Sequence, residues 1–162
     1  MPQSSLPGVM DALVAMFTAT VPADVPVSVG GPPGGDIPAR YACIGWAGED
    51  APGVVGGNVT SQSDVAMPGP AGNFGQQSSE TYAVWCAVST SSGDEGGGAA
   101  VAATMAIYLP LVAAIRANRG MTGAIHPPGL ADLGAWQLQL ESGGRIATVF
   151  FEVAVTAPWV VA

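Results

Sequence analysis

The chain contains no lysine, and four arginines stand against twelve acidic residues, so its formal net charge is −8 at pH 7. Proteins that grip nucleic acid through its phosphates need clustered lysine and arginine, which excludes that mode of binding here. The charge is still compatible with passive contact between the protein and DNA, because an acidic surface repels DNA and lets it slide past. No basic residues interleave with Trp46, Trp85, Trp136 and Trp159. We therefore expect these tryptophans to be core or interface anchors rather than a stacking platform for bases.

Residues suited to covalent or metal chemistry are scarce as well. His126 is the only histidine and lies in the segment IHPPG, and the chain has no serine or cysteine in an elbow motif. Cys43 and Cys86 lie in strand-like runs and have no zinc-chelating spacing with His126. They are typical of small buried hydrophobic residues, although the sequence leaves open a disulfide between neighbouring strands.

A glycine-rich stretch, SGDEGGG at 92–98, is the one segment that could suggest a phosphate loop. The phosphate-binding pattern needs a lysine after its glycines, and Asp94 and Glu95 would repel a pyrophosphate. Glu49 and Asp50 form a second acidic pair, but neither pair has the ligand spacing of a calcium loop. The sequence thus predicts no enzyme activity, no cofactor and no metal site.

Apolar residues are plentiful: 49% of the 162 residues are hydrophobic and only 10% are charged. This amount of apolar material suits one domain over residues 1–162.

Positions 96–115 carry no charge, a length that could span a bilayer. The run is rich in alanine, opens on glycines and contains Pro110, so we expect a buried helix and no membrane partner. Its expected buried side chains are Met105, Ile107, Leu111, Val112 and Ile115.

Hydrophobic periodicity predicts an α+β fold, a mostly antiparallel sheet with an N-terminal helix and one long central helix packed on one face. Helices are expected at 6–20 and about 95–117, and strands at about 25–29, 39–47, 81–90, 134–142 and 145–157. A long loop is expected at about 48–79, in which Val54, Val55 and residues 58–62 could form a short ribbon.

One segment resembles a known family. The sequence YAVWCAVSTSSGDEGGGAAVAATMAIYLPLVAAIRANRGMTGAI, residues 82–125, is similar to the central segment of tail terminator proteins of long-tailed bacteriophages, especially those of actinobacterial hosts. The resemblance extends over about residues 6–157. Its features are the strand Tyr82–Ser89, the loop Ser92–Glu95, the helix Gly98–Arg116, the turn Met121–Gly123, the strand pair within Trp136–Val155, and the strand Arg40–Trp46.

The resemblance implies a structural role in the virion, at the junction of head and tail, after assembly in the host cytoplasm. Such proteins form a ring, here expected to be a hexamer, that caps the tail tube, stops its elongation and offers a surface to the head–tail connector. DNA passes through the lumen, and an acidic lining would not trap it. The expected partners are further copies of the chain, the tail tube protein, the connector or neck protein, and DNA in passive contact.

The loop at 48–79 is the candidate contact with the tube or a neighbouring subunit, because a loop can fold on binding. Its candidate contact residues are Glu49, Asp50, Val54, Val55, Asn58, Asp64, Met67 and Phe74. Two alternatives stay open. One is another ring subunit, either a head-completion or neck adaptor or a tail-tube-like protein. The other is a small-ligand-binding domain, which would need a pocket with converging polar groups.

Overall fold

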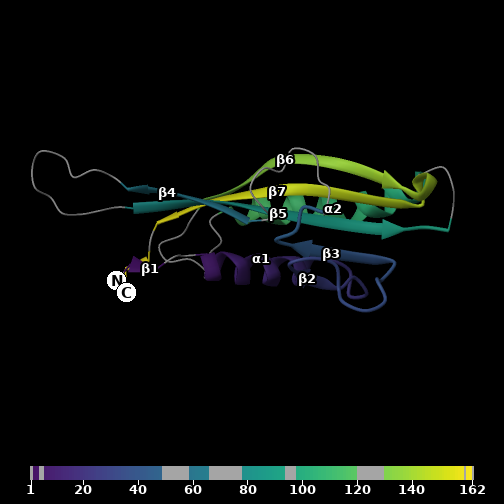
Figure 1. Cartoon of the computed structure of the whole chain (residues 1–162), viewed down its shortest axis with the longest axis horizontal. Coiled ribbons are helices and arrows are strands. Elements are labelled where there is room, and N and C mark those ends of the chain that lie inside the picture. Colours follow the sequence, from purple (N-terminus) through teal and green to yellow (C-terminus); the bar gives the residue numbers. More distant parts are fainter. Residues whose placement is uncertain are drawn as a thin grey trace, which may run out of the picture.

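The computed structural model describes residues 2–3, 6–48, 59–65, 78–93, 98–119, 130–158 and 160–161. Within them, two α-helices pack on a six-stranded sheet, and a two-stranded sheet joins the two ends of the chain (Figure 1). The elements in chain order are β1 (Pro2–Gln3), α1 (Leu6–Thr20), β2 (Val27–Val29), β3 (Arg40–Ile44), β4 (Val59–Val65), β5 (Ser78–Ser91), α2 (Gly98–Ala117), β6 (Leu130–Glu141), the short 3₁₀ turn η1 (Ser142–Gly144), β7 (Ile146–Pro158) and β8 (Val160–Val161). The predicted α+β class is confirmed.

The main sheet has the strand order β2-β3-β5-β7-β6, and β4 also pairs with β5. Only β2 and β3 run parallel; every other pair in the described residues is antiparallel. The long strand β5 pairs with β4 through its first half, residues 78–84, and with β3 through its second half, residues 86–90. β3 and β4 therefore lie end to end along one side of β5. The long loop expected at 48–79 is accordingly interrupted by strand β4.

Helix α1 has the predicted bounds, and its inward face is fully buried at Val9, Leu13 and Phe17. The spacing of these residues, four apart, places them above one another on a single stripe of the helix. The ring of Phe17 stacks on that of Phe151 in β7, with centroids 6.1 Å apart. This contact anchors α1 over the middle of the sheet.

Helix α2 packs against β5, β7 and β6, on the same face of the sheet as α1. Ile107, Leu111, Val112 and Ile115 are buried as expected, whereas Met105 is only half-buried. By length and composition α2 is apolar enough to cross a membrane, a test that the core helix of a soluble protein also passes. The expectation that the chain has no membrane partner stays a prediction.

The two faces of the sheet differ in what covers them. Toward the helices, alternate residues of β5 such as Val84, Cys86 and Val88 join the main core. On the opposite face a smaller cluster contains Cys43, Ala87 and Phe150. Cys43 pairs in register with Ala87, one position beyond Cys86, so the two thiols point to opposite faces. Both cysteines are free and buried, which answers the disulfide question.

Candidate interaction surfaces

Strand β6 changes phase at a β-bulge. Leu133 pairs with Val153, and Trp136 pairs with Phe151. Between these two pairs β6 advances three residues while β7 advances two. A Cβ added at Gly134 would lie 2.8 Å from a carboxylate oxygen of Glu152 and 3.2 Å from its Cβ, so the Glu152 side chain would have to shift. The extra residue shifts the alternation by one position. As a result, Trp136 and the alternate residues after it face the helix side of the sheet, as Leu133 does.

These helix-side residues of β6 are exposed because β6 is the outermost strand. Trp136 is 57% exposed, Leu138 38% and Leu140 50%. From α2, the ring of Tyr108 reaches Trp136, with centroids 6.3 Å apart. Leu109, on the outward side of α2, is 55% exposed. We call Leu109, Trp136, Leu138 and Leu140 the β6 patch.

The outward face of α2, which includes Leu109 of the β6 patch, is also uncharged. Its exposed side chains before Arg116 are small or apolar: Ala99, Ala102, Ala106, Leu109, Pro110 and Ala113. A helix whose outer face is apolar is unusual for a surface helix, which normally carries charge there. The face and the β6 patch together form an uncharged surface that is suited to contact with another protein.

The opposite edge of the sheet carries the other exposed large hydrophobic residues. Val29 in β2 is 58% exposed, and Ile37, in the segment between β2 and β3, is 64% exposed. We call these two residues the β2 patch. Among the described residues, the two patches contain every large hydrophobic side chain that is strongly exposed. Four of the six exposed residues lie on the two edge strands: Val29 on β2, and Trp136, Leu138 and Leu140 on β6.

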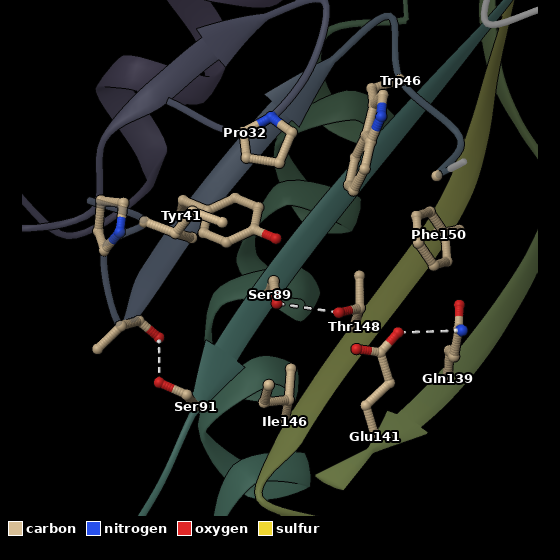
Figure 2. A pocket seen from close by; sticks show the side chains of 14 residues that line it. Pro32, Tyr41, Trp46, Ser89, Ser91, Gln139, Glu141, Ile146, Thr148 and Phe150 are labelled. Atoms are coloured by element: carbon tan, nitrogen blue, oxygen red, sulfur yellow. Dashed lines mark hydrogen bonds between the residues drawn. The ribbon is translucent and has the colours of Figure 1, made fainter. Parts of the chain in front are cut away.

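A cavity of about 530 Å³ lies on the face of the sheet that the helices leave uncovered (Figure 2). Tyr41, Trp46 and Phe150 supply aromatic walls, and the rings of Trp46 and Phe150 have centroids 5.7 Å apart. Burial raises the pKa of the Tyr41 phenol, against a smaller opposing effect of its hydrogen bond with Ser89. The Tyr41 hydroxyl is therefore neutral at physiological pH.

The polar groups of the cavity are already partly paired with each other. The hydroxyls of Ser89 and Thr148 share a hydrogen bond of 2.9 Å, and the Gln139 amide donates to the Glu141 carboxylate at 3.2 Å. Hydroxyls, an amide and one carboxylate beside aromatic rings can hold a polar ligand. Within the part of the chain that the structure describes, no cluster of three or more metal-ligating side chains is found.

Most of the residues proposed for the partner-contact loop lie outside the described residues: Glu49, Asp50, Val54, Val55, Asn58, Met67 and Phe74. So do His126, Asp94 and Glu95. Asp64 lies in β4, paired in register with Ser79. The β6 patch was missed as a surface, although its alternation of Trp and Leu with Gln was visible. That alternation shows which side chains share a face, but only the strand order makes β6 an edge strand, so the sequence pattern alone did not identify the surface.

Comparison with protein-family models and with curated proteins finds no match for this chain.

Proposed function

We propose that this chain is a virion structural protein of a long-tailed bacteriophage. Copies of it form a ring, expected to be a hexamer, that caps the tail tube, stops its elongation and offers the surface for head–tail joining. The observation that carries the proposal is the pair of uncharged apolar patches at the two open edges of one sheet. An edge with these properties needs a protein neighbour, because an uncovered apolar edge promotes aggregation.

The resemblance of residues 82–125 to tail terminators supplies the biological setting. The order of strand, loop, helix and closing strand pair that carries the resemblance agrees with β5, α2, β6 and β7. The net charge of −8 supports the DNA-passage part of the proposal, since a ring with acidic inner walls repels rather than binds DNA.

The test is polymerisation of cognate tail tube protein with and without the purified chain, followed by negative-stain electron microscopy. We expect rings at one end of the tubes and a shorter distribution of tube lengths as the chain is added. A variant that fails to fold, such as Leu111→Asp, serves as the control and should leave tube length unchanged. Unchanged tubes with the folded chain would refute the capping role. Rings that bind a purified connector but ignore tubes would favour the neck adaptor.

A second function, ligand binding, is favoured by the cavity that Tyr41, Trp46 and Phe150 line. Its test is a thermal-shift screen of small polar compounds against the chain and its Tyr41→Phe and Glu141→Gln variants. A compound that stabilises the parent chain and neither variant would support this function. The absence of any stabilising compound would leave the ring proposal as the better account.

A further inference from the structure

One residue of each apolar patch, Val29 and Trp136, lies at an end of one row of residues across the sheet. The other residue of the β2 patch, Ile37, lines the cavity on the opposite face. Val29 pairs with Ile44, which pairs with Cys86, which pairs with Phe151, which pairs with Trp136. Residues that pair in register share a face of the sheet, and the three inner members belong to the core beneath the helices. The row therefore begins and ends with a side chain that is more than half exposed.

The next row on the same face is also apolar, but its β2 end, Val27, is partly buried against the core. Val27 pairs with Ala42, then Val88, Val149 and finally Leu138. Its inner members are fully buried, and Leu138 at its end is exposed. Two consecutive rows thus run from β2 to β6 as continuous apolar stripes that stop at open strand edges.

Strand direction at the two edges is compatible with direct pairing. β2 runs parallel to β3, and each further step to β5, β7 and β6 reverses direction. β2 and β6 are therefore antiparallel to each other. If a second copy in the same orientation is placed beside the first, its β2 lies antiparallel to β6. Antiparallel pairing is the more stable arrangement per residue, and it would extend both apolar rows across the boundary.

A second copy of the chain fits both edges at once. A two-fold contact of β6 with β6 would cover one patch in each molecule and leave the β2 patch open. Two molecules of charge −8 also repel each other, so a contact between them must avoid charge, and all six side chains of the two patches are uncharged. A head-to-tail contact is the arrangement that covers both patches in every copy.

We propose that the β6 patch of one copy packs against the β2 patch of the next, with β6 and β2 antiparallel, so that the sheet continues from subunit to subunit. This inference rests on the proposed ring function and names the contact that would build the ring. β2 is only three residues long, so each contact is short. The assembly is consequently expected to be weak in dilute solution and to form when copies are concentrated or held on a tube.

The experiment uses thiol cross-linking between the two edges. Val29→Cys and Leu138→Cys are made separately and together, and each is treated with a short bis-maleimide at high protein concentration and again on tail tubes. Cys43 and Cys86 are buried, so the parent chain reports the background. We expect no dimer from either single variant, dimers from an equimolar mixture of the two, and a ladder ending at one closed species from the double variant.

A charge variant provides the second readout. Leu138→Glu should weaken association on the order of tenfold or more, because the new carboxylate lies in the contact. Gln137→Glu, one position along the same strand on the opposite face, is the matched control and should leave association unchanged. Circular dichroism melts of both variants verify that they fold.

The outcomes separate the inference from the function on which it rests. Dimers from Leu138→Cys alone would establish a two-fold contact and overturn the proposal, and so would the absence of cross-links from the mixture both free and on tubes. Tube capping without the ladder would leave the terminator function standing and remove this contact. A complete ladder without capping would confirm the contact and refute the terminator function.

Discussion

Replacing Thr104 with valine should lower the free energy of unfolding by about 1–3 kcal/mol, because it removes a buried hydroxyl that connects three elements of the fold. The hydroxyl of Thr104 in α2 lies 3.0 Å from the carbonyl oxygen of Ala147 in β7 and hydrogen-bonds to the hydroxyl of Thr90 in β5. Both threonines are buried, with exposed fractions of 0% and 1%. A valine has nearly the same shape, so the change tests the hydrogen bonds rather than packing.

The geometry also predicts how the two threonines couple. Each hydroxyl has one proton. The Thr104 hydroxyl has the carbonyl oxygens of Ala147 and Ala100 as acceptors, 3.0 and 2.9 Å away, and the Thr90 hydroxyl has that of Ala100, 2.9 Å away. The hydrogen bond between the two hydroxyls therefore uses the proton of one of them. Thr104→Val and Thr90→Val each break the shared bond, and the double variant loses it only once. The double variant should therefore cost less than the sum of the two single variants, by about 0.5–1.5 kcal/mol.

The assay is urea unfolding at a fixed protein concentration, followed by tryptophan fluorescence and circular dichroism. For a chain of this length the single Thr104→Val variant should also lower the melting temperature by roughly 2–12 °C. Thr18→Val, at an exposed position of α1, is the control and should change stability by less than about 0.5 kcal/mol. Strict additivity of Thr90→Val and Thr104→Val would refute the shared hydrogen bond.

Three further predictions concern the core, the bulge and a thiol. Leu111→Asp should abolish folding because it buries an unpaired charge, whereas Leu109→Asp, on the outward face, should fold; soluble yield and circular dichroism compare them. Gly134→Val should lower the melting temperature because its Cβ meets the Glu152 side chain, and Glu152→Ala in the same chain should restore part of the loss. Burial raises the pKa of Cys43 from 9.0 to about 11, so the thiolate is favoured in the unfolded chain and stability should fall as pH rises from 9 to 11. Cys43→Ser, measured over the same pH range by urea unfolding, should remove that part of the slope; an unchanged slope would contradict it.

Local sequence patterns were sufficient to predict the helices and strands whose own hydrophobic residues repeat with a helical or strand period. The helix expected at 6–20 has the bounds of α1, and its buried residues Val9, Leu13 and Phe17 repeat every four positions. The strands expected at about 134–142 and 145–157 correspond to β6 and β7, and the turn between them lies at Ser142–Gly144. These elements depend on neighbours that are close in sequence, so the amino-acid pattern contains the information that forms them.

Strand β4, Val59–Val65, overlaps the short ribbon expected at residues 58–62, although local patterns did not give its full length or its partner strand. Its residues, VTSQSDV, are mostly polar and have no apolar alternation. The strand exists because β5 is fourteen residues long and β3 pairs with only five of them, which leaves an open length of β5 for β4 to join. Such pairing is decided by the partner strand rather than by intrinsic preference. The contact role proposed for the surrounding loop stays a prediction.

Hydrophobic periodicity could not predict which side chains are exposed at the edge of the sheet. β6 and β7 have the same alternation, yet Phe151 is buried while Trp136, paired with it in register, is more than half exposed. The difference is that β7 has strands on both sides and β6 has one. Alternation tells which side chains share a face, and strand order tells whether that face is covered. The proposal that this row continues into a neighbouring subunit accounts for the exposed residue at each of its ends, and the cross-linking experiment measures that contact.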